Sequence, residues 1–174
     1  LSSRGETLLV APRTGLLTRI DARSGRTLGR LDPNAAPSAA ALGFGSSWLA
    51  YREADLVVRV DSSGAITQIP VGRRPSAIAV GKRAVWVANS GDGSVSQIVK
   101  ASGKVNTVRN VAAQPVDVVI GAGAVWVAGS GDARVVRIDG GKLTFDAAVP
   151  VGPNPRALAI VGRDVWVISA GDGH

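Results

Sequence analysis

An all-β fold made of repeated antiparallel sheets is predicted by three sequence registers that recur together about every forty residues. An aliphatic residue follows each of the first three tryptophans at a constant distance of twelve positions, and Leu8 with Ile20 extends the series one unit upstream. The tryptophans recur at spacings of 38, 40 and 40 residues, at Trp48, Trp86, Trp126 and Trp166. Four prolines recur at the same spacings, at Pro37, Pro75, Pro115 and Pro155.

Each unit of the repeat is predicted to contain four short strands and no helix. In one representative unit, apolar residues at 76–80 and 84–89 indicate the first two strands. The Ser-Gly-Asp-Gly stretch at 90–93 is typical of a tight turn, because glycine accepts positive φ and aspartate can bond its own backbone. Alternating residues at 94–99 and the segment 104–111 then predict the third and fourth strands.

The second strand of each unit must be covered on both faces. Residues 85–88, 125–128 and 165–168 are apolar at every position rather than at alternate ones, which predicts burial on both sides of the sheet. Sheets stacked face to face around an axis meet this need. We therefore predict a β-propeller of four-stranded antiparallel blades, about four repeats, with each tryptophan packed between neighbouring blades. The prolines would open the inner strand of each blade, an edge position where a missing N–H is tolerated. The whole chain, 1–174, is assigned to this one region, with units at 5–36, 37–74, 75–114, 115–154 and a partial unit at 155–174.

The segments between units resemble a known repeat family. Residues 69–75, Ile-Pro-Val-Gly-Arg-Arg-Pro, and residues 149–155, Val-Pro-Val-Gly-Pro-Asn-Pro, each precede an apolar strand and then the runs 85–89 and 165–169. This pattern resembles the YVTN-type β-propeller repeat. The resemblance implies a bacterial, actinobacterial-like domain outside the cytoplasm, secreted or at the cell surface. It also implies a sensor module that binds a ligand or a protein, often attached to a Ser/Thr kinase or a regulator.

The pattern leaves the ring incomplete. It begins in the second strand of one blade and stops after the first two strands of another. Because propellers commonly have about four to eight blades, we expect the missing blades to come from sequence outside this chain or from a second copy, which would make a homodimer. An open blade would expose a strand edge and an apolar face.

Few side chains are suited to catalysis. The chain has no cysteine and one histidine, His174, so we predict no metal site, no cofactor and no Ser-His-Asp arrangement. Propeller lyases of a similar blade type depend on internal histidines, which this sequence lacks. Asp92, Asp132 and Asp172 recur six residues after a tryptophan, a turn position that favours a backbone role. A noncatalytic domain is expected. The alternatives are a lyase or hydrolase that uses carboxylates, or a self-assembling structural module.

The candidate ligand-binding residues are Arg73, Arg74, Asp117 and Arg156. Asp117 stands two residues after a proline, where the other units have alanine, and could line the central channel. The arginines belong to a cationic rim formed by the linkers between units, and guanidinium groups suit carboxylate or phosphate. With a formal net charge of +7, this rim predicts a protein, peptide, anionic small ligand or glycan as partner. Nucleic acid is not expected, because the tryptophans would be buried rather than free to stack on bases. No segment has the roughly 18 consecutive apolar residues of a membrane span.

Overall fold

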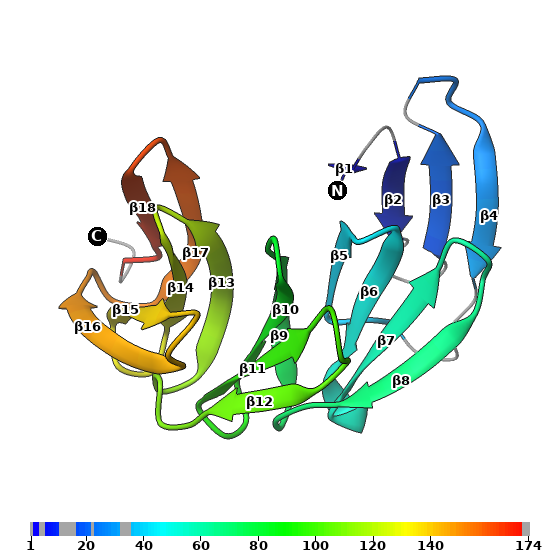
Figure 1. Ribbon diagram of the computed structural model, residues 1–174. Helices are drawn as coiled ribbons and strands as arrows, with labels where there is room; N and C mark the ends of the chain where they lie inside the picture. Colours follow the sequence, from blue (N-terminus) through cyan, green and yellow to red (C-terminus); the bar gives the residue numbers. More distant parts are fainter. Residues whose placement is uncertain (1, 4–5, 11–16, 22, 32–35, 172–174) are drawn as a thin grey trace.

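The chain forms five antiparallel sheets that follow one another along an arc (Figure 1). The computed structural model describes residues 2–3, 6–10, 17–21, 23–31 and 36–171. Four of the sheets have four strands each, in the order of the chain, and the fifth is a two-stranded hairpin. The prediction of an all-β fold built from four-stranded antiparallel blades is therefore confirmed.

The blades are numbered here in chain order. Blade 1 contains β1 (Ser2–Ser3), β2 (Glu6–Val10), β3 (Leu17–Asp21) and β4 (Thr27–Leu31). Blade 2 contains β5 (Ala39–Gly43), β6 (Ser46–Tyr51), β7 (Leu56–Asp61) and β8 (Ile66–Pro70). Blade 3 contains β9 (Pro75–Val80), β10 (Ala84–Asn89), β11 (Ser94–Val99) and β12 (Val105–Val108). Blade 4 contains β13 (Pro115–Gly121), β14 (Ala124–Gly129), β15 (Arg134–Asp139) and β16 (Thr144–Pro150). The terminal hairpin contains β17 (Pro155–Val161) and β18 (Asp164–Ser169).

Two details of the strands differ from the sequence prediction. Blade 1 has a first strand, because Ser2 and Ser3 pair with Thr7 and Glu6, and two residues are too short a run to show in a repeat pattern. The fourth strand of blade 3 ends at Val108 rather than at 111, because the chain turns at Asn110 with a φ of 54°. In the described ranges the helical structure is one 3-10 turn, Arg52–Ala54, and no helix is long and apolar enough to cross a membrane.

The first strands of the blades line the inside of the arc. β5 packs on β9, β9 on β13, and β13 on β17, and Figure 1 shows the fourth strands on the outside. Pro75, Pro115 and Pro155 are the first residues of β9, β13 and β17. Each of these is an edge strand, so the predicted reason is confirmed for these three prolines, whereas Pro37 lies two residues before β5.

The tryptophans fill the spaces between blades, with one exception. Trp48 and Trp86 are each 4% exposed and belong to the cores between blades 2 and 3 and between blades 3 and 4. Trp126 is half-buried against Val165 and Val167 of the hairpin. Trp166 is 62% exposed, so the prediction that every tryptophan packs between blades is wrong for this one. In the described structure no further sheet covers its face of the hairpin.

Candidate functional site

The linkers that enter blades 3 and 4 and the hairpin form one end of the blades, which we call the linker rim. Each linker is held by main-chain bonds from the turn after the second strand of the following sheet. Ser90 and Gly91 N–H donate to the carbonyls of Arg74 and Arg73 at 3.0 and 2.9 Å. The same pair of bonds recurs in the next unit, and its first member recurs in the hairpin, with donors Ser130, Gly131 and Ala170 and acceptors Gln114, Ala113 and Asn154.

Aspartates in these turns complete the attachment. Asp92 Oδ2 accepts the N–H of Arg73 at 3.0 Å, and Asp132 Oδ2 accepts the N–H of Ala113 at 2.9 Å. The predicted backbone role is confirmed for both, although each bonds a linker nineteen residues away, and only Asp92 also bonds its own turn, at Ser94. Asp172 lies outside the described residues. Asp55 plays a similar part from blade 2, because its Oδ1 accepts the N–H of Arg74 at 2.7 Å.

The residue before the proline that opens each of β9, β13 and β17 has a left-handed backbone. Arg74, Gln114 and Asn154 have φ of 52°, 49° and 49°, a region uncommon for residues with a Cβ. Such conformations persist where the surroundings over-determine them, and here the carbonyl of each residue accepts a bond from the neighbouring turn. The backbone of the rim is therefore set by the fold, and the side chains extend from fixed points.

A buried polar cluster lies beneath the first of these linkers. Asn89 Nδ2 donates to Ser94 Oγ and Ser96 Oγ, both at 3.0 Å, and Ser96 Oγ also accepts the N–H of Gly72 at 3.2 Å. Ser94 Oγ donates to Asp92 Oδ1 at 2.6 Å. The sequence contains a signal for this cluster, because Ser94 and Ser96 stand where blade 2 has Leu56 and Val58. This cluster fixes the backbone that carries Arg73.

A polar cleft of about 600 Å³ opens at the linker rim between blades 3 and 4. Its lining includes the turn at 90–93, Asn110, Gln114 and Arg134. Arg73 and Arg74 lie directly on Gly91, where a Cβ would come within 2.9 Å of Arg74 Cγ. Arg134 Nε lies 2.5 Å from Asp132 Oδ2 in an ion pair. Arg73 and Arg74 therefore lie next to the cleft without lining it, whereas Arg134 lines it and is paired.

Asp117 joins two sheets. Its Oδ1 accepts the N–H of Val118 at 2.9 Å, and its Oδ2 accepts the N–H of Leu158, on β17, at 2.7 Å. Earlier blades use a serine one position before: Ser38 and Ser76 Oγ each donate, at 2.7 Å, to the carbonyl of the proline that opens the next inner strand. The fourth blade has Val116 there, which cannot donate, and Asp117 provides the connection instead.

The structure does not gather the four predicted residues into one site. Arg73 and Arg74 lie together, whereas Arg156 is exposed on β17 and is separated from them by blade 4. Among the described residues no recorded contact joins Arg156 to Asp117 or to the two arginines. The ligand-binding role assigned to the four residues stays a prediction.

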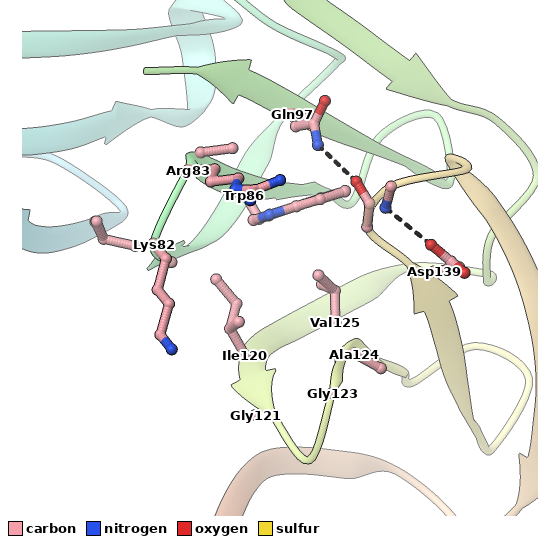
Figure 2. Close-up of a pocket in the computed structure, with 15 residues that line it drawn as sticks. Lys82, Arg83, Trp86, Gln97, Ile120, Gly121, Gly123, Ala124, Val125 and Asp139 are labelled. Atoms are coloured by element: carbon pink, nitrogen blue, oxygen red, sulfur yellow. Dashed lines mark hydrogen bonds between the residues drawn. The ribbon is translucent and has the colours of Figure 1, made fainter. Parts of the chain in front are cut away.

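The opposite end of the blades, which we call the turn rim, holds a larger cleft that sequence reasoning missed. It measures about 880 Å³ and lies between blades 3 and 4. Figure 2 shows Trp86 and Arg83 on one side, with Ile120 and Val125 facing them. Hydrogen bonds from the N–H groups of Lys142 and Gly141 hold the pKa of Asp139, at its edge, below the usual value. The site therefore combines an apolar interior with cationic and anionic ends.

Comparison with known proteins identifies the fold and no family. No protein-family model and no curated protein matches the chain. A streptogramin B lyase structure aligns with 95% of this chain and 59% of its own, at TM-score 0.79 and 18% identity. The virginiamycin B lyase from Staphylococcus aureus aligns with 95% of this chain and 60% of its own, at TM-score 0.80 and 18% identity. The hydrazine synthase of Kuenenia stuttgartiensis aligns with 89% of this chain and 49% of its own, at TM-score 0.78 and 20% identity. The chain thus spans about half to three fifths of these proteins and has the β-propeller fold.

Proposed function

We propose that this chain is a noncatalytic binding module whose linker rim recognises a multivalent anionic ligand, such as an acidic peptide or an anionic glycan. The observation that carries the proposal is the fixed placement of Arg73 and Arg74. Their main chains make hydrogen bonds to Asp92, Asp55, Ser90 and Gly91. Because the backbone is already ordered, binding loses entropy mainly from the two side chains.

The guanidinium groups have little competition from the protein itself. Arg74 Nη2 lies 3.9 Å from Glu53 Oε1, and the two side chains are 56% and 83% exposed. Exposed pairs of this kind contribute about 0–1 kcal/mol, so an anionic ligand can displace Glu53. Carboxylates and sulfates offer the paired oxygens that guanidinium groups bind best.

The hydrogen bonds of three aspartates at the linker end of the blades support a noncatalytic role. Asp92, Asp132 and Asp117 each accept main-chain N–H groups that hold linkers or strands together. A proton-transfer catalyst must be free to exchange its proton with the substrate, and these three side chains are instead part of the framework.

A lyase is the alternative, and the likeness to two lyase structures is the observation that favours it. The direct test is incubation of the protein with virginiamycin B, followed by mass spectrometry of the antibiotic. We expect the antibiotic to remain intact over many hours at equimolar protein. Steady conversion in proportion to protein concentration would overturn the noncatalytic proposal.

The setting of the module is also proposed rather than shown. The repeat pattern supports a bacterial domain outside the cytoplasm, attached to a Ser/Thr kinase or a regulator, in which ligand binding would be sensed. The hairpin face with Val161, Trp166 and Ile168, which are 64%, 62% and 64% exposed, supports association with a second copy, because the matching faces of blades 2 to 4 are covered. Light scattering should then give twice the 17.7 kDa chain mass, and Trp166→Ser/Ile168→Ser should give the monomer value.

Calorimetric titration with a peptide of eight glutamates tests the binding proposal. The Arg73→Ala/Arg74→Ala variant should bind about tenfold more weakly, since two charge-assisted contacts of about 0.7 kcal/mol each are lost. The matched control is Lys82→Ala/Arg83→Ala, which removes the same charge from the turn rim and should bind normally. Equal weakening by both variants would show attraction to net charge alone and would contradict a specific rim site.

A further inference from the structure

The turn between the first two strands of blade 3 differs from those of its neighbours. In blades 2 and 4 this turn has left-handed backbone at both central residues, with φ of 57° and 67° at Phe44 and Gly45 and of 47° and 78° at Ala122 and Gly123. Such values are typical of a type I′ hairpin turn. In the described structure Lys82 and Arg83, at the same positions of blade 3, are not among the residues with positive φ.

Within the described residues, this difference leaves the Trp86 indole N–H without a hydrogen-bond acceptor. In blades 2 and 4 the tryptophan Nε1–H donates to the carbonyl of the residue before the turn, Trp48 to Gly43 at 3.1 Å and Trp126 to Gly121 at 3.2 Å. No such bond to Gly81, or to any other described residue, is recorded for Trp86. The Trp86 side chain is nevertheless 96% removed from solvent and lines the turn-rim cleft. Trp86 Nε1 is not among the fully buried polar atoms that lack a partner, so it is open to the cleft and can donate to an acceptor bound there.

A second substitution in the repeat keeps this cleft open. The residue paired with the tryptophan across the strand is arginine in blades 2 and 4, where Arg59 lies 5.6 Å from the Trp48 ring centre and Arg137 lies 6.0 Å from that of Trp126. In blade 3 it is Gln97. Gln97 Nε2 donates to the carbonyl of Gly140 at 3.0 Å, as Figure 2 shows. No cation therefore covers Trp86 within the described part of the chain.

The charges at the two ends of the cleft set the orientation of a ligand. Lys82 and Arg83 are exposed at the turn and line one end. Asp139 lies at the other, where two N–H groups keep its carboxylate ionised. An anionic group would therefore lie at the Lys82 end. The space between is walled by Ile120, Val125 and Trp86, and its volume falls within the range of about 300–1,000 Å³ that is usual for small-molecule pockets.

We propose that the turn-rim cleft binds a planar organic carboxylate, with the carboxylate oxygens at Lys82, Arg83 and the Trp86 indole N–H and the ring against Ile120. This site is separate from the linker rim, and it does not depend on the function proposed there. The matching cleft between blades 2 and 3, which Trp48 and Arg59 line, measures about 400 Å³, so arginine at position 97 would narrow the turn-rim cleft in the same way. The larger of the two clefts belongs to the blade that has both a different turn and a glutamine opposite its tryptophan.

The proposal is tested by titration with 2-naphthoate, in which binding is monitored through the indole ¹⁵N–¹H resonances of the four tryptophans. Trp86→Phe identifies the Trp86 resonance by its loss. We expect this resonance to shift in a saturable manner. Lys82→Ala/Arg83→Ala should weaken binding about tenfold, and Trp86→Phe about threefold, because the latter retains the ring but loses one donor.

Two further variants and one analogue separate the possible outcomes. Gln97→Arg, which restores the residue of the neighbouring blades, should fold normally and abolish binding. Arg73→Ala/Arg74→Ala, at the other rim, should leave the affinity unchanged within about twofold. Binding that survives Gln97→Arg, equal binding of the neutral 2-naphthamide, or no shift of the Trp86 resonance at millimolar 2-naphthoate would each overturn the proposal.

Discussion

Replacing Asp117 with alanine should loosen the terminal hairpin from blade 4. The Asp117 carboxylate accepts the N–H of Leu158 across the gap between β13 and β17 at 2.7 Å. Leu158 is 8% exposed, so water has little access to its N–H after the substitution. A buried donor left without an acceptor destabilises a protein by about 1–3 kcal/mol, and bonds to charged acceptors lie in the upper part of that range. We therefore expect a loss of about 2–3 kcal/mol in the free energy of unfolding.

A second substitution, taken from the other blades, should restore part of the stability that Asp117→Ala loses. Val116→Ser would restore the hydroxyl with which Ser38 and Ser76 connect the earlier blades to their successors. In the Asp117→Ala background it should recover about 1 kcal/mol, the net value of a neutral hydrogen bond. This partial rescue is expected only if the Asp117 connection is structural.

Urea denaturation gives the free energy of unfolding, and hydrogen exchange of the Leu158 amide gives the local effect. The matched control is Asp164→Ala, which removes an exposed carboxylate from the same hairpin. A change below about 0.5 kcal/mol for Asp117→Ala, together with unchanged protection of the Leu158 amide, would refute this reasoning. A ligand-binding role for Asp117 would then be the better explanation of its position.

Three further changes test other parts of the account. Trp86→Ala should lower the free energy of unfolding by about 3–5 kcal/mol, because this side chain is 4% exposed. Measured at protein concentrations where light scattering gives the monomer mass, Trp166→Ala should lower it by about 1 kcal/mol or less, because its side chain is 62% exposed in a single chain. Equal losses in urea denaturation would contradict the assigned packing. Gly72→Ala should lower the free energy of unfolding by about 1–3 kcal/mol, since its Cβ would lie 2.5 Å from Asn89 Nδ2. An unchanged melting temperature would contradict this expectation. The pKa of Asp139 is held below 3.8 in the folded chain. The carboxylate therefore stabilises the fold above its unfolded pKa, and this contribution is lost as the pH falls through the folded pKa. The stability of Asp139→Ala, measured by urea denaturation, should depend less on pH below about pH 4, and an unchanged acid dependence would count against the assigned bonds.

The blades were predictable because apolar residues recur at the same positions of each unit, and these positions are the buried ones. Uninterrupted apolar runs around Trp86 and Trp126 indicated strands covered on both faces, and both strands are found where expected. The prolines at the start of β9, β13 and β17 were predicted for a different reason, because an edge strand tolerates a missing N–H. Trp166 shows the limit of such reasoning, because the pattern gives a side chain's face and does not show whether another sheet covers it.

The sites were less predictable because they depend on departures from the repeat. Asp117 was recognised as an exception, but its bond to Leu158 joins residues 41 positions apart and has no local signal. The cluster around Asn89 depends on two serines that read as ordinary alternation in a strand. Gln97 could have been found by aligning the units, since arginine stands at the matching position in blades 2 and 4. The free indole N–H of Trp86, by contrast, depends on backbone angles in the preceding turn.

The central claim, that Arg73 and Arg74 form an anion-binding rim, is tested most directly by the side-chain Nε–H resonances of the arginines during titration with the glutamate peptide. We predict that the resonances of Arg73 and Arg74 shift in a saturable manner, that the effect weakens as salt is raised, and that the Trp86 indole resonance stays in place. Shifts spread evenly over all arginines, or shifts confined to the turn rim, would contradict the claim.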